Sequence, residues 1–512
     1  MKKKKLLQYG VDVNMVKLIK NMYEKTSQML KINGKVTSPF KTYKGVRQGC
    51  ILSPRLFNLF INDIPEIFDE QCHPVKIGNM HLQCLMYADD LVILSESKEG
   101  LQRSMSKIEQ YTNNWDMKLN EKKTKVVTFQ KQGPMPKIDI IFNGQVLEHV
   151  KQYKYLGSII SRNGGFKLNT KYLKAKGLRA RYLVTKTIGT EGKPSTIIKI
   201  FQKMVEPILL YNCEIGQIDI PKNTDLSKFE KRMWDFNSER DKVVYGLLRQ
   251  ILGLQKKTTK LGMLAEVGKH PLSLKIYIQT MKSYVRLITT ESKLLQNALL
   301  EAMKRQGEGK NGWLQQIMFL RQSTKLDNKF ELVKGQASFI TKFKKALYQK
   351  FEEYWQEERQ KNGKLRFYFE SKNKFTYERY LDKTEKKYRT SITQIRLSSH
   401  KLPIEVMRYQ EALVEKRICT ICDKNETGDE QHYLERCENV AMEECRSRFR
   451  VEVEKVQPQF QKMSMENIIH YCLQTHDEGT YDPFGRYVHN MLKVYDDEVE
   501  RLFDSATQCP LM

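Results

Sequence analysis

The stretch LMYADDLVILSES, Leu85 to Ser97, places two acids side by side between two apolar runs. Apolar residues alternate before Asp89 and Asp90 and a continuous apolar run follows them. The pattern therefore predicts a strand, a tight turn and a second strand, with the acids at the tip. Two carboxylates this close repel each other unless a proton or a cation lies between them. Mg²⁺ commonly joins one or two carboxylates to substrate phosphates, so the pair is a candidate metal site; the alternative is a plain polar turn.

The segments on either side of this hairpin predict a small α+β sheet. Upstream, GVRQGCILSPRLFNLFINDIP (Gly45 to Pro65) predicts a loop and then a helix with Ser53 as its N-cap and Pro54 at its first position. Downstream, a helix over residues 101–115 precedes a strand over residues 125–129. The order helix, two strands, helix, strand matches a ferredoxin-like βαββαβ sheet without its first strand.

The composition favours a polyanionic partner. The 512 residues carry a formal net charge of +28, which favours nucleic acid. No apolar run approaches the length of a membrane span, and only two leucines follow the basic run Lys2 to Lys5, so neither a span nor a signal peptide is predicted. Ten cysteines in so long a chain indicate reduced thiols or metal ligands. We expect a nuclear or cytoplasmic protein that is not secreted and contacts no membrane.

Four residues near the C-terminus have the spacing of metal ligands. The segment CTICDKNETGDEQHYLERC contains Cys419, Cys422, His432 and Cys437 in the pattern C-x2-C-x9-H-x4-C. Three thiolates and one imidazole suit a tetrahedral Zn²⁺, and four protein ligands leave no position for water, so the predicted role is structural. The alternative is four unrelated reduced side chains. Cys445 lies outside the quartet.

Four motifs carry a resemblance to a known family. GVRQGCILSP, MYADD, NEKKT (Asn120 to Thr124) and KYLG (Lys154 to Gly157) resemble, in this order, consecutive motifs of the reverse transcriptases of non-LTR (LINE-type) retrotransposons. The likeness covers residues 45 to about 161 and is sharp again near the C-terminus, in KLRFYF, RLSSHKLPIEVMRY and the Cys/His segment. It implies an α+β fold: an incomplete right-hand polymerase palm with a ferredoxin-like sheet, then a mainly helical thumb and a C-terminal region with a small zinc module.

The resemblance also implies domain boundaries, partners and an activity. The expected parts are partial fingers and palm (1–161), a helical thumb (162–300), a helical basic connector (301–400), a zinc-knuckle-like module (401–450) and a helical tail (451–512). The activity would be RNA-directed DNA synthesis by two-metal phosphoryl transfer, with an RNA template, a DNA primer or target DNA, and dNTPs as partners.

Particular residues match the family's functional positions. Asp89 and Asp90 would bind Mg²⁺, with Asp89 as the better direct ligand. Lys123 would protonate the departing pyrophosphate, although a solvated basic turn is the alternative. The remaining matches are Gln48, Gly49 and Tyr87 for nucleotide and template, and Tyr155, Leu156 and Gly157 for the primer grip. An ordinary strand aromatic is the alternative for Tyr87, and a plain strand end for the primer grip.

Two basic regions follow the palm. Between Phe166 and Lys203, ten Lys or Arg stand against one acid, Glu191, and the helical pattern places Tyr172, Ala175, Leu178 and Tyr182 on one face. Phosphate contacts to a duplex are the expected use, and reversing Lys171, Lys174 and Arg181 should weaken them. Between residues 342 and 389, aromatics alternate with basic residues, which fits single-strand contact or equally a charged helical scaffold. The aromatics concerned are Tyr354, Trp355, Phe367, Tyr368 and Phe375.

The match to the family has one gap. These enzymes carry a third metal-binding aspartate in a segment that would lie just upstream of residue 1, so we expect a truncated copy or partial gene whose polymerase is inactive in this chain. Asp12 is a helix cap in this interpretation and no substitute. The alternative is a nonenzymatic nucleic-acid-binding remnant acting through the basic thumb and zinc module. A group II intron maturase or telomerase-like relative fits the Cys/His tail less well.

Overall fold

The computed structural model describes residues 3–24, 26–41, 45–130, 133–215, 224–234, 236–307, 312–326, 336–361, 363–410, 413–474 and 477–507. Contacts divide the chain into two compact units. The first unit comprises Met1–Tyr155, Ile160–Gly164 and Thr290–Lys304, and the second comprises Leu156–Ile159, Gly165–Thr289 and Arg305–Met512. The finer division at residues 300, 400 and 450 stays a prediction.

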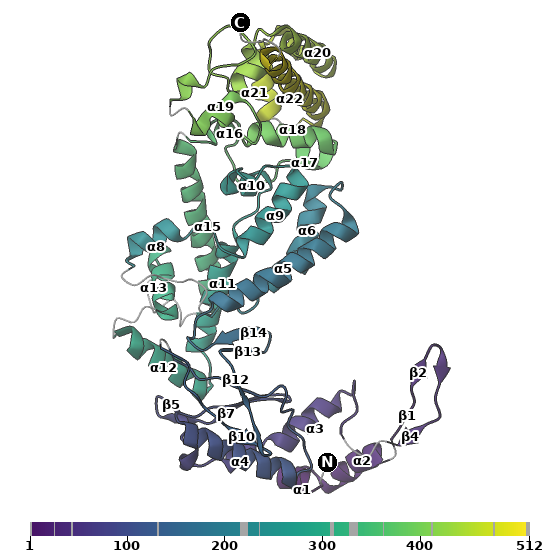
Figure 1. Ribbon diagram of the computed structural model, residues 1–512, viewed down its shortest axis with the longest axis vertical. Helices are drawn as coiled ribbons and strands as arrows, with labels where there is room; N and C mark the ends of the chain where they lie inside the picture. The colour runs from purple at the N-terminus through teal and green to yellow at the C-terminus, as the bar shows by residue number, and fades with distance from the viewer. Residues whose placement is uncertain are drawn as a thin grey trace. The chain divides into compact units, whose positions relative to one another are not determined.

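The first unit combines helices with short strands (Figure 1). Its helical elements are α1 (Lys3–Gln8), α2 (Val13–Glu24), α3 (Leu52–Ile61), η1 (Ile64–Ile67), η2 (Glu70–Cys72) and α4 (Lys98–Asn114), and most of α12 (Lys293–Gly307) also belongs here. Its first strands are β1 (Ser27–Gln28), β2 (Lys31–Ile32), β3 (Lys35–Val36), β4 (Phe40–Lys41), β5 (Val75–Ile77), β6 (Met80–Leu82), β7 (Cys84–Tyr87) and β8 (Asp90–Ile93). Then come β9 (Lys125–Val126), β10 (Ile141–Phe142), β11 (Gln145–Val146), β12 (Glu148–His149) and β13 (Gln152–Tyr155). The last strand, β14 (Ser158–Ser161), has its first two residues in the second unit and its last two in the first.

The described strands pair only in twos. The predicted order of helix, two strands, helix and strand is present as α3, β7, β8, α4 and β9, with an additional hairpin, β5–β6, before β7. However, β7 and β8 bond to each other, whereas β9 pairs in parallel with β12 after the β10–β11 hairpin turns the chain back. The hydrogen bonds therefore do not join these strands into the single ferredoxin-like sheet that the order predicted.

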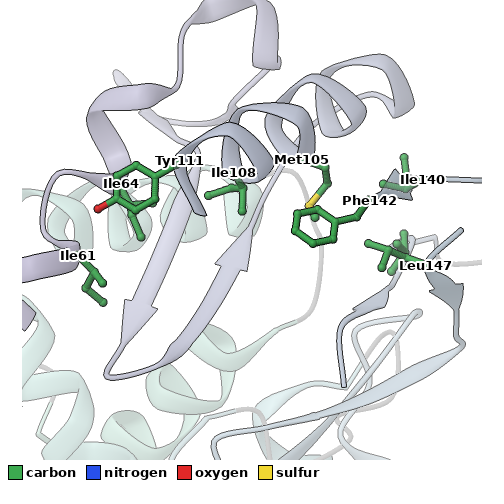
Figure 2. Close-up of a cluster of buried hydrophobic side chains, with 9 residues drawn as sticks. Ile61, Ile64, Met105, Ile108, Tyr111, Ile140, Phe142 and Leu147 are labelled. Atoms are coloured by element: carbon green, nitrogen blue, oxygen red, sulfur yellow. The ribbon is translucent and has the colours of Figure 1, made fainter. Parts of the chain in front are cut away.

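The core of the first unit lies between α4 and the strands. Figure 2 shows Met105 of α4 beside Phe142 of β10, and Tyr111 of α4 near Ile64 of η1. The inward faces of β7 and β8 pack on the same cluster. Helix α4 begins where the hydroxyl of Ser97 accepts a hydrogen bond from the amide of Gly100, as an N-cap residue does. The β7–β8 hairpin therefore rests on a buried apolar base.

One predicted helix start is wrong. Helix α3 begins at Leu52, and no side chain caps it, so Ser53 lies inside its first turn instead of at the N-cap. The Ser53 hydroxyl is 2.9 Å from the hydroxyl of Tyr23 on α2. The side chain that would have capped α3 thus joins two helices instead.

The second unit is almost entirely helical among its described residues (Figure 1). Its helices up to α13 are α5 (Lys167–Ile188), α6 (Pro194–Met204), α7 (Glu206–Leu209), α8 (Leu226–Arg232), α9 (Asp241–Leu252), α10 (Lys260–Glu266), α11 (Leu272–Ile288) and α13 (Trp313–Ser323). Later helices are α15 (Gln336–Gln360), α16 (Arg366–Ser371), α17 (Tyr380–Lys383), α18 (Lys386–Arg396), α19 (Pro403–Val406), α20 (Val440–Val456), α21 (Met465–Gln474) and α22 (Glu478–Thr507). Short turns of other helical types are η3 (Met407–Tyr409), η4 (Val414–Lys416), η5 (His432–Arg436) and η6 (Pro458–Lys462).

Aromatic side chains build part of the core of this unit. The ring of Trp355 is buried, with its centroid 5.1 Å from that of Phe369 and 5.3 Å from that of Phe375. Phe367 and Tyr368 are buried as well. These aromatics pack against one another and are not free to stack on bases, so the scaffold interpretation of this region is the one that the structure favours.

A buried ion pair ties further helices together. The Nε atom of Arg396 on α18 donates to Glu266 of α10 over 2.8 Å, and its Nη1 atom donates to the carbonyl oxygen of Leu473 on α21 over 2.7 Å. The hydroxyl of Tyr380 donates to the same carboxylate. Because each charge is satisfied by hydrogen bonds, this cluster is a structural junction. In the described part of the chain, none of the helices is both long and apolar enough to span a bilayer.

Candidate active site and Cys/His cluster

The two adjacent acids lie at the tip of the β7–β8 hairpin. Tyr87 pairs with Asp90 across the strands, which leaves Ala88 and Asp89 as the two turn residues. Ala88 has φ +51°, and a positive φ at the first turn position is a glycine-like feature of tight hairpin turns. An alanine held in this conformation costs about 1–2 kcal/mol, and backbone strain of this kind is enriched at functional sites.

The hairpin presents its acids on an open face. Met86, Leu91 and Ile93 point toward the core of the first unit. Side chains alternate along a strand, so Tyr87 and Asp90, which face each other across the hairpin, point the opposite way. Tyr87 is 64% exposed, and both Asp89 and Asp90 are exposed. The predicted strand, turn and strand are confirmed, with Asp89 in the turn and Asp90 at the first position of β8.

Tyr155, at the end of β13, lies near this hairpin. Burial and, after it, the charge of Asp90 raise the pKa of Tyr155. An ionised phenol would add a second negative charge beside the carboxylate, so Tyr155 stays neutral there. The structure thus brings together two residues that are 65 positions apart in the sequence, one from the predicted metal site and one from the predicted primer grip.

The two residues after Tyr155 form the turn between β13 and β14. Both have positive φ, +43° at Leu156 and +80° at Gly157, which is the pattern of a type I′ hairpin turn. Glycine adopts this conformation without strain, whereas leucine does not. Gly157 is therefore required by the turn itself.

The predicted nucleotide-binding loop precedes α3. Gln48 is exposed, and Gly49 has φ +82° with open space on the side where a Cβ would lie. Arg47 donates a hydrogen bond to the carbonyl oxygen of Met22, which attaches the loop to α2. Gly49 is thus needed for its backbone conformation, and its open side leaves room for the backbone to approach a ligand.

Lys123 lies in a turn that its own neighbours stabilise. Its amide donates to the carbonyl and side-chain oxygens of Asn120, and its carbonyl accepts a hydrogen bond from the hydroxyl of Tyr153. The Lys123 side chain is in an exposed position. Its catalytic role stays a prediction, because these contacts fix the backbone and leave the ammonium group to solvent.

No third acid joins Asp89 and Asp90 among the residues that the structure describes. In that part of the chain, the only group of three or more Cys, His, Asp or Glu side chains with close ligand atoms is the Cys/His cluster. Two carboxylates on one hairpin are one acid short of the three metal-binding aspartates that the resemblance implies for a two-metal site. The hairpin therefore fits Mg²⁺ as an incomplete site.

The four predicted zinc ligands do come together. The Sγ atoms of Cys419, Cys422 and Cys437 and one ring nitrogen of His432 all lie within 4.8 Å of one another. Cys419, His432 and Cys437 are buried, and the Cys422 Sγ is 3.5 Å from the His432 Nε2. Three sulfurs and one imidazole at these separations suit a tetrahedral zinc ion.

A residue outside the predicted quartet orients the histidine. The Nδ1 atom of His432 is 3.0 Å from a carboxylate oxygen of Glu426, which leaves Nε2 directed at the thiols. Zinc-bound histidines usually have such a partner on the other nitrogen, because it fixes the ring and its tautomer. No spacing pattern in the sequence marks Glu426 as such a partner. The amide of Cys419 also donates to the carbonyl oxygen of Glu426, which closes the knuckle.

The Cys/His segment is packed into the helices around it. Tyr433 and Leu434 are fully buried, and the ring of Tyr433 meets that of Tyr495 on α22 at 5.1 Å. The hydroxyl of Tyr487, also on α22, donates to the carbonyl oxygen of Leu434 over 2.5 Å. The segment is therefore part of the apolar core of the second unit.

The basic helix α5 buries a face other than the one that carries Tyr172, Ala175, Leu178 and Tyr182. Leu173, Gly177 and Val184 are buried, whereas Ala175 and Tyr182 are exposed. Two of the three basic residues that the sequence predicted to contact phosphates are engaged within the protein. Lys174 binds Glu239, and Arg181 is half-buried and donates to the carbonyl oxygen of Val243. Lys171, Arg179 and Lys186 are exposed, and their spacing of eight and seven residues places them on one side of the helix.

The chain is similar to known polymerases. Residues 4–160 match the family model described as "Reverse transcriptase (RNA-dependent DNA polymerase)". The RNA-directed DNA polymerase from mobile element jockey of Drosophila melanogaster is 26% identical over 211 residues, which is 39% of this chain and 22% of that protein.

Two further relatives come from R2 elements. The Pol polyprotein from a type-1 retrotransposable element R2 of Nasonia vitripennis is 31% identical over 146 residues, 27% of this chain and 14% of that protein. The R2DM polyprotein of Drosophila melanogaster is 25% identical over 238 residues, 44% of this chain and 22% of that protein. The matched region thus spans less than a quarter of each of these relatives.

The matched residues include the β7–β8 hairpin, the loop before α3 and the β13–β14 turn. The comparisons favour the polymerase family over the nonenzymatic alternative. Residues 4–160 are a reverse transcriptase domain of the non-LTR (LINE-type) retrotransposon kind.

Proposed function

We propose that the reverse transcriptase domain of this chain binds the substrates for copying RNA into DNA, namely an RNA template, a DNA primer or target DNA, and dNTPs, and that the two acids of its hairpin do not by themselves support processive synthesis. The observation that carries the proposal is the open hairpin tip with Asp89 and Asp90, beside which lies Tyr155 of the predicted primer grip. A strained turn with two exposed carboxylates serves no packing purpose. Its use is in binding a cation and, through it, phosphates.

Asp89 and Asp90 would hold Mg²⁺, which when bound neutralises charge on the transferring phosphoryl group. The chain's own residues then have separate tasks. Tyr87, on the same open face as Asp90, would border the primer end and exclude water there. Lys123 would protonate the departing pyrophosphate, a task that a flexible exposed ammonium group can perform. Gln48 and Gly49 would contact the nucleotide and the template.

The exposed side of α5 would follow the backbone of the bound duplex. Lys171, Arg179 and Lys186 present three cations on one side of a helix, and phosphate contacts of this kind supply affinity that does not depend on sequence. A polymerase needs such affinity because it must move along its template. Tyr182, exposed on the same side, adds a flat surface between the cations.

The Cys/His cluster would hold one structural Zn²⁺ through Cys419, Cys422, His432 and Cys437. Bound zinc would fix the knuckle against α22, because the segment that carries His432 also carries the buried Tyr433 and Leu434. Its role would be to hold this end of the second unit together. Direct contact with nucleic acid is not needed for that role.

Equilibrium binding tests the proposal. The full chain is titrated into a fluorescent DNA primer annealed to an RNA template, and anisotropy is recorded at several salt concentrations with Mg²⁺ present. We expect saturable binding that weakens steeply with salt. Iron(II) in place of Mg²⁺, with a reductant and peroxide, should cut the chain near residue 89, and Asp89→Ala should abolish the cut. Absence of duplex binding at low salt contradicts the proposal.

A further inference from the structure

The turn at Leu156 and Gly157 is held from outside the hairpin. The hydroxyl of Tyr211, two residues after α7, donates to the carbonyl oxygen of Leu156 over 2.7 Å. The Tyr211 ring lies directly on Gly157, where an added Cβ would be 3.1 Å from the ring carbon Cε1. Leucine in a left-handed conformation costs about 1–2 kcal/mol, so this turn needs such outside contacts to persist.

Two asparagines hold the start of β14. The side-chain amide of Asn212 donates to the hydroxyl oxygen of Ser158 over 2.7 Å. The amide of Ile159 donates to the side-chain oxygen of Asn169, which is buried in α5. Together with Tyr211, these residues fix three of the four positions from 156 to 159 in place.

The held turn remains accessible. Leu156 is 36% exposed and Tyr211 is 43% exposed, so each offers an apolar surface to a ligand although its polar atoms are engaged. A flat aromatic ring with an open side suits a base or a sugar at the end of a nucleic-acid strand. The turn also begins one residue after Tyr155.

We propose that Tyr211 and Asn212 are positioning residues that hold the turn 156–158 against the 3′ end of the primer. The proposal rests on the proposed function, since it requires a primer. In-line attack needs the primer hydroxyl placed within a fraction of an ångström, and a strained turn without support would not keep that position. Tyr211 and Asn212 supply the support through one hydrogen bond each and one ring contact.

Photocrosslinking of the full chain tests this. The DNA primer carries a 3′-terminal 4-thiothymidine, the duplex is irradiated, and crosslinked peptides are identified by mass spectrometry. Anisotropy gives the Kd of the same duplex. Tyr211→Phe removes only the hydroxyl, and Asn212→Gly removes the side-chain amide that donates to Ser158 at a position whose positive φ suits glycine. Tyr348→Phe, on an exposed tyrosine of α15, is the matched control.

In the unmodified chain the primer terminus should crosslink to residues 155–158. Tyr211→Phe and Asn212→Gly should each lower the crosslink yield about two- to tenfold, the effect of one hydrogen bond, while the Kd changes less than twofold. Tyr348→Phe should change neither quantity. Normal duplex binding with an unchanged yield in Tyr211→Phe, or crosslinks that map elsewhere, overturns the proposal. Absence of duplex binding in the unmodified chain instead contradicts the proposed function.

A second measurement uses protein stability and needs no nucleic acid. It tests the contact between Tyr211 and Gly157 even if a variant fails to bind the duplex. Gly157→Ala should lower the unfolding midpoint in the unmodified chain, partly through contact with the Tyr211 ring. The drop should be smaller when Tyr211→Ala is also present. Equal drops in both backgrounds would show that the ring does not hold the turn.

Discussion

The ammonium group of Lys5 lies 2.7 Å from a carboxylate oxygen of Asp63, and its side chain is only 3% exposed. The Tyr111 hydroxyl donates to the same carboxylate over 2.6 Å. The Lys5 nitrogen also stands 3.9 Å from the centre of the Trp115 ring, in a cation–π contact. Lys5 belongs to the basic run Lys2 to Lys5, and its buried side chain attaches α1 to the core of the first unit.

Replacing Lys5 by alanine should destabilise the first unit by about 3 kcal/mol, because Asp63 would keep its charge in a partly buried place without its cation. Denaturant unfolding followed by the fluorescence of Trp115 measures the loss. Lys17→Ala, at an exposed position on α2, is the control and should change stability by less than about 0.5 kcal/mol. Equal stability of the two variants would contradict the role of Lys5.

The same pair predicts an acid-dependent loss of stability. Although burial opposes it, hydrogen bonds from Lys5 and Tyr111 lower the pKa of Asp63 below its ordinary value. Ionised Asp63 therefore stabilises the folded state. This stabilisation is complete above about pH 4, the pKa of an aspartate in the unfolded chain, and is lost as the pH falls through the lower pKa of the folded state. In Lys5→Ala this part of the acid dependence should disappear.

The 512-residue chain should show no processive primer extension on an RNA template with Mg²⁺. Two carboxylates on one hairpin cannot hold two metal ions in the geometry of in-line transfer, and no third acid joins them among the described residues. Gel analysis of an end-labelled primer measures this directly. Extension that disappears in Asp89→Ala would refute the prediction, since it would show that the hairpin is sufficient.

Reversing the charges of Lys171, Arg179 and Lys186 to glutamate should weaken binding of an RNA–DNA duplex and make its salt dependence shallower. Each lost phosphate contact should reduce the slope of log affinity against log salt by about 0.9. Anisotropy titrations between low and physiological salt give that slope. The control is the same charge reversal at Lys256, Lys282 and Lys345, which are exposed elsewhere in the second unit. It changes the net charge equally and should change the duplex affinity and its salt dependence less. Equal effects of both triples would mean that α5 has no special role.

One zinc ion per chain should bind to the Cys/His cluster. Cys422→Ser and His432→Ala should lose it, whereas Cys445→Ser should keep it. Glu426→Gln should weaken zinc binding about 10- to 100-fold, because the carboxylate orients His432. Metal analysis measures the zinc content of each variant, and competition with a chelator measures its zinc affinity. Since Tyr433 and Leu434 pack on α22, chelation should also increase hydrogen exchange in α20 to α22 of the full chain. Unchanged exchange there would contradict the structural role.

The stability of the second unit should fall as the pH rises from about 4 to 6. Burial of Asp241, at the start of α9, raises the pKa of its carboxyl group to about 6. Between these pH values the unfolded state has released a proton that the folded state still holds. This difference lowers the free energy of unfolding by up to about 3 kcal/mol. In Asp241→Asn the fall should be absent. Thermal unfolding midpoints at several pH values, compared with Asp482→Asn at an exposed position of α22, would decide this.

The hairpin, the grouping of the four Cys/His side chains and the family could be predicted from the sequence alone. The β7–β8 hairpin follows from alternation over few residues, because a strand has a period of two and a tight turn joins neighbours. The Cys/His quartet follows from spacing within 19 residues, because the knuckle is local. Such patterns are readable since the residues that meet in space are also close in the chain.

The choice of helix faces needed the tertiary structure. On α5 the aromatic and small residues that look like a buried stripe are partly exposed, and Leu173, Gly177 and Val184 are buried instead. The aromatics around Trp355 were open to an RNA-binding interpretation, and they form a core. A helix that carries apolar residues on several sides buries whichever face its neighbours cover, and the neighbours are chosen by contacts far apart in sequence.

The long-range hydrogen bonds that hold the fold and the 156–158 turn were also decided by the tertiary structure alone. Lys5 reaches Asp63 across 58 positions, Tyr111 reaches it across 48, and Tyr211 reaches Leu156 across 55. No local pattern marks these side chains, since lysine, tyrosine and aspartate are ordinary surface residues elsewhere in the chain. Their roles arise when folding removes water from around one hydrogen-bonding group and places its partner beside it, which no short stretch of sequence specifies.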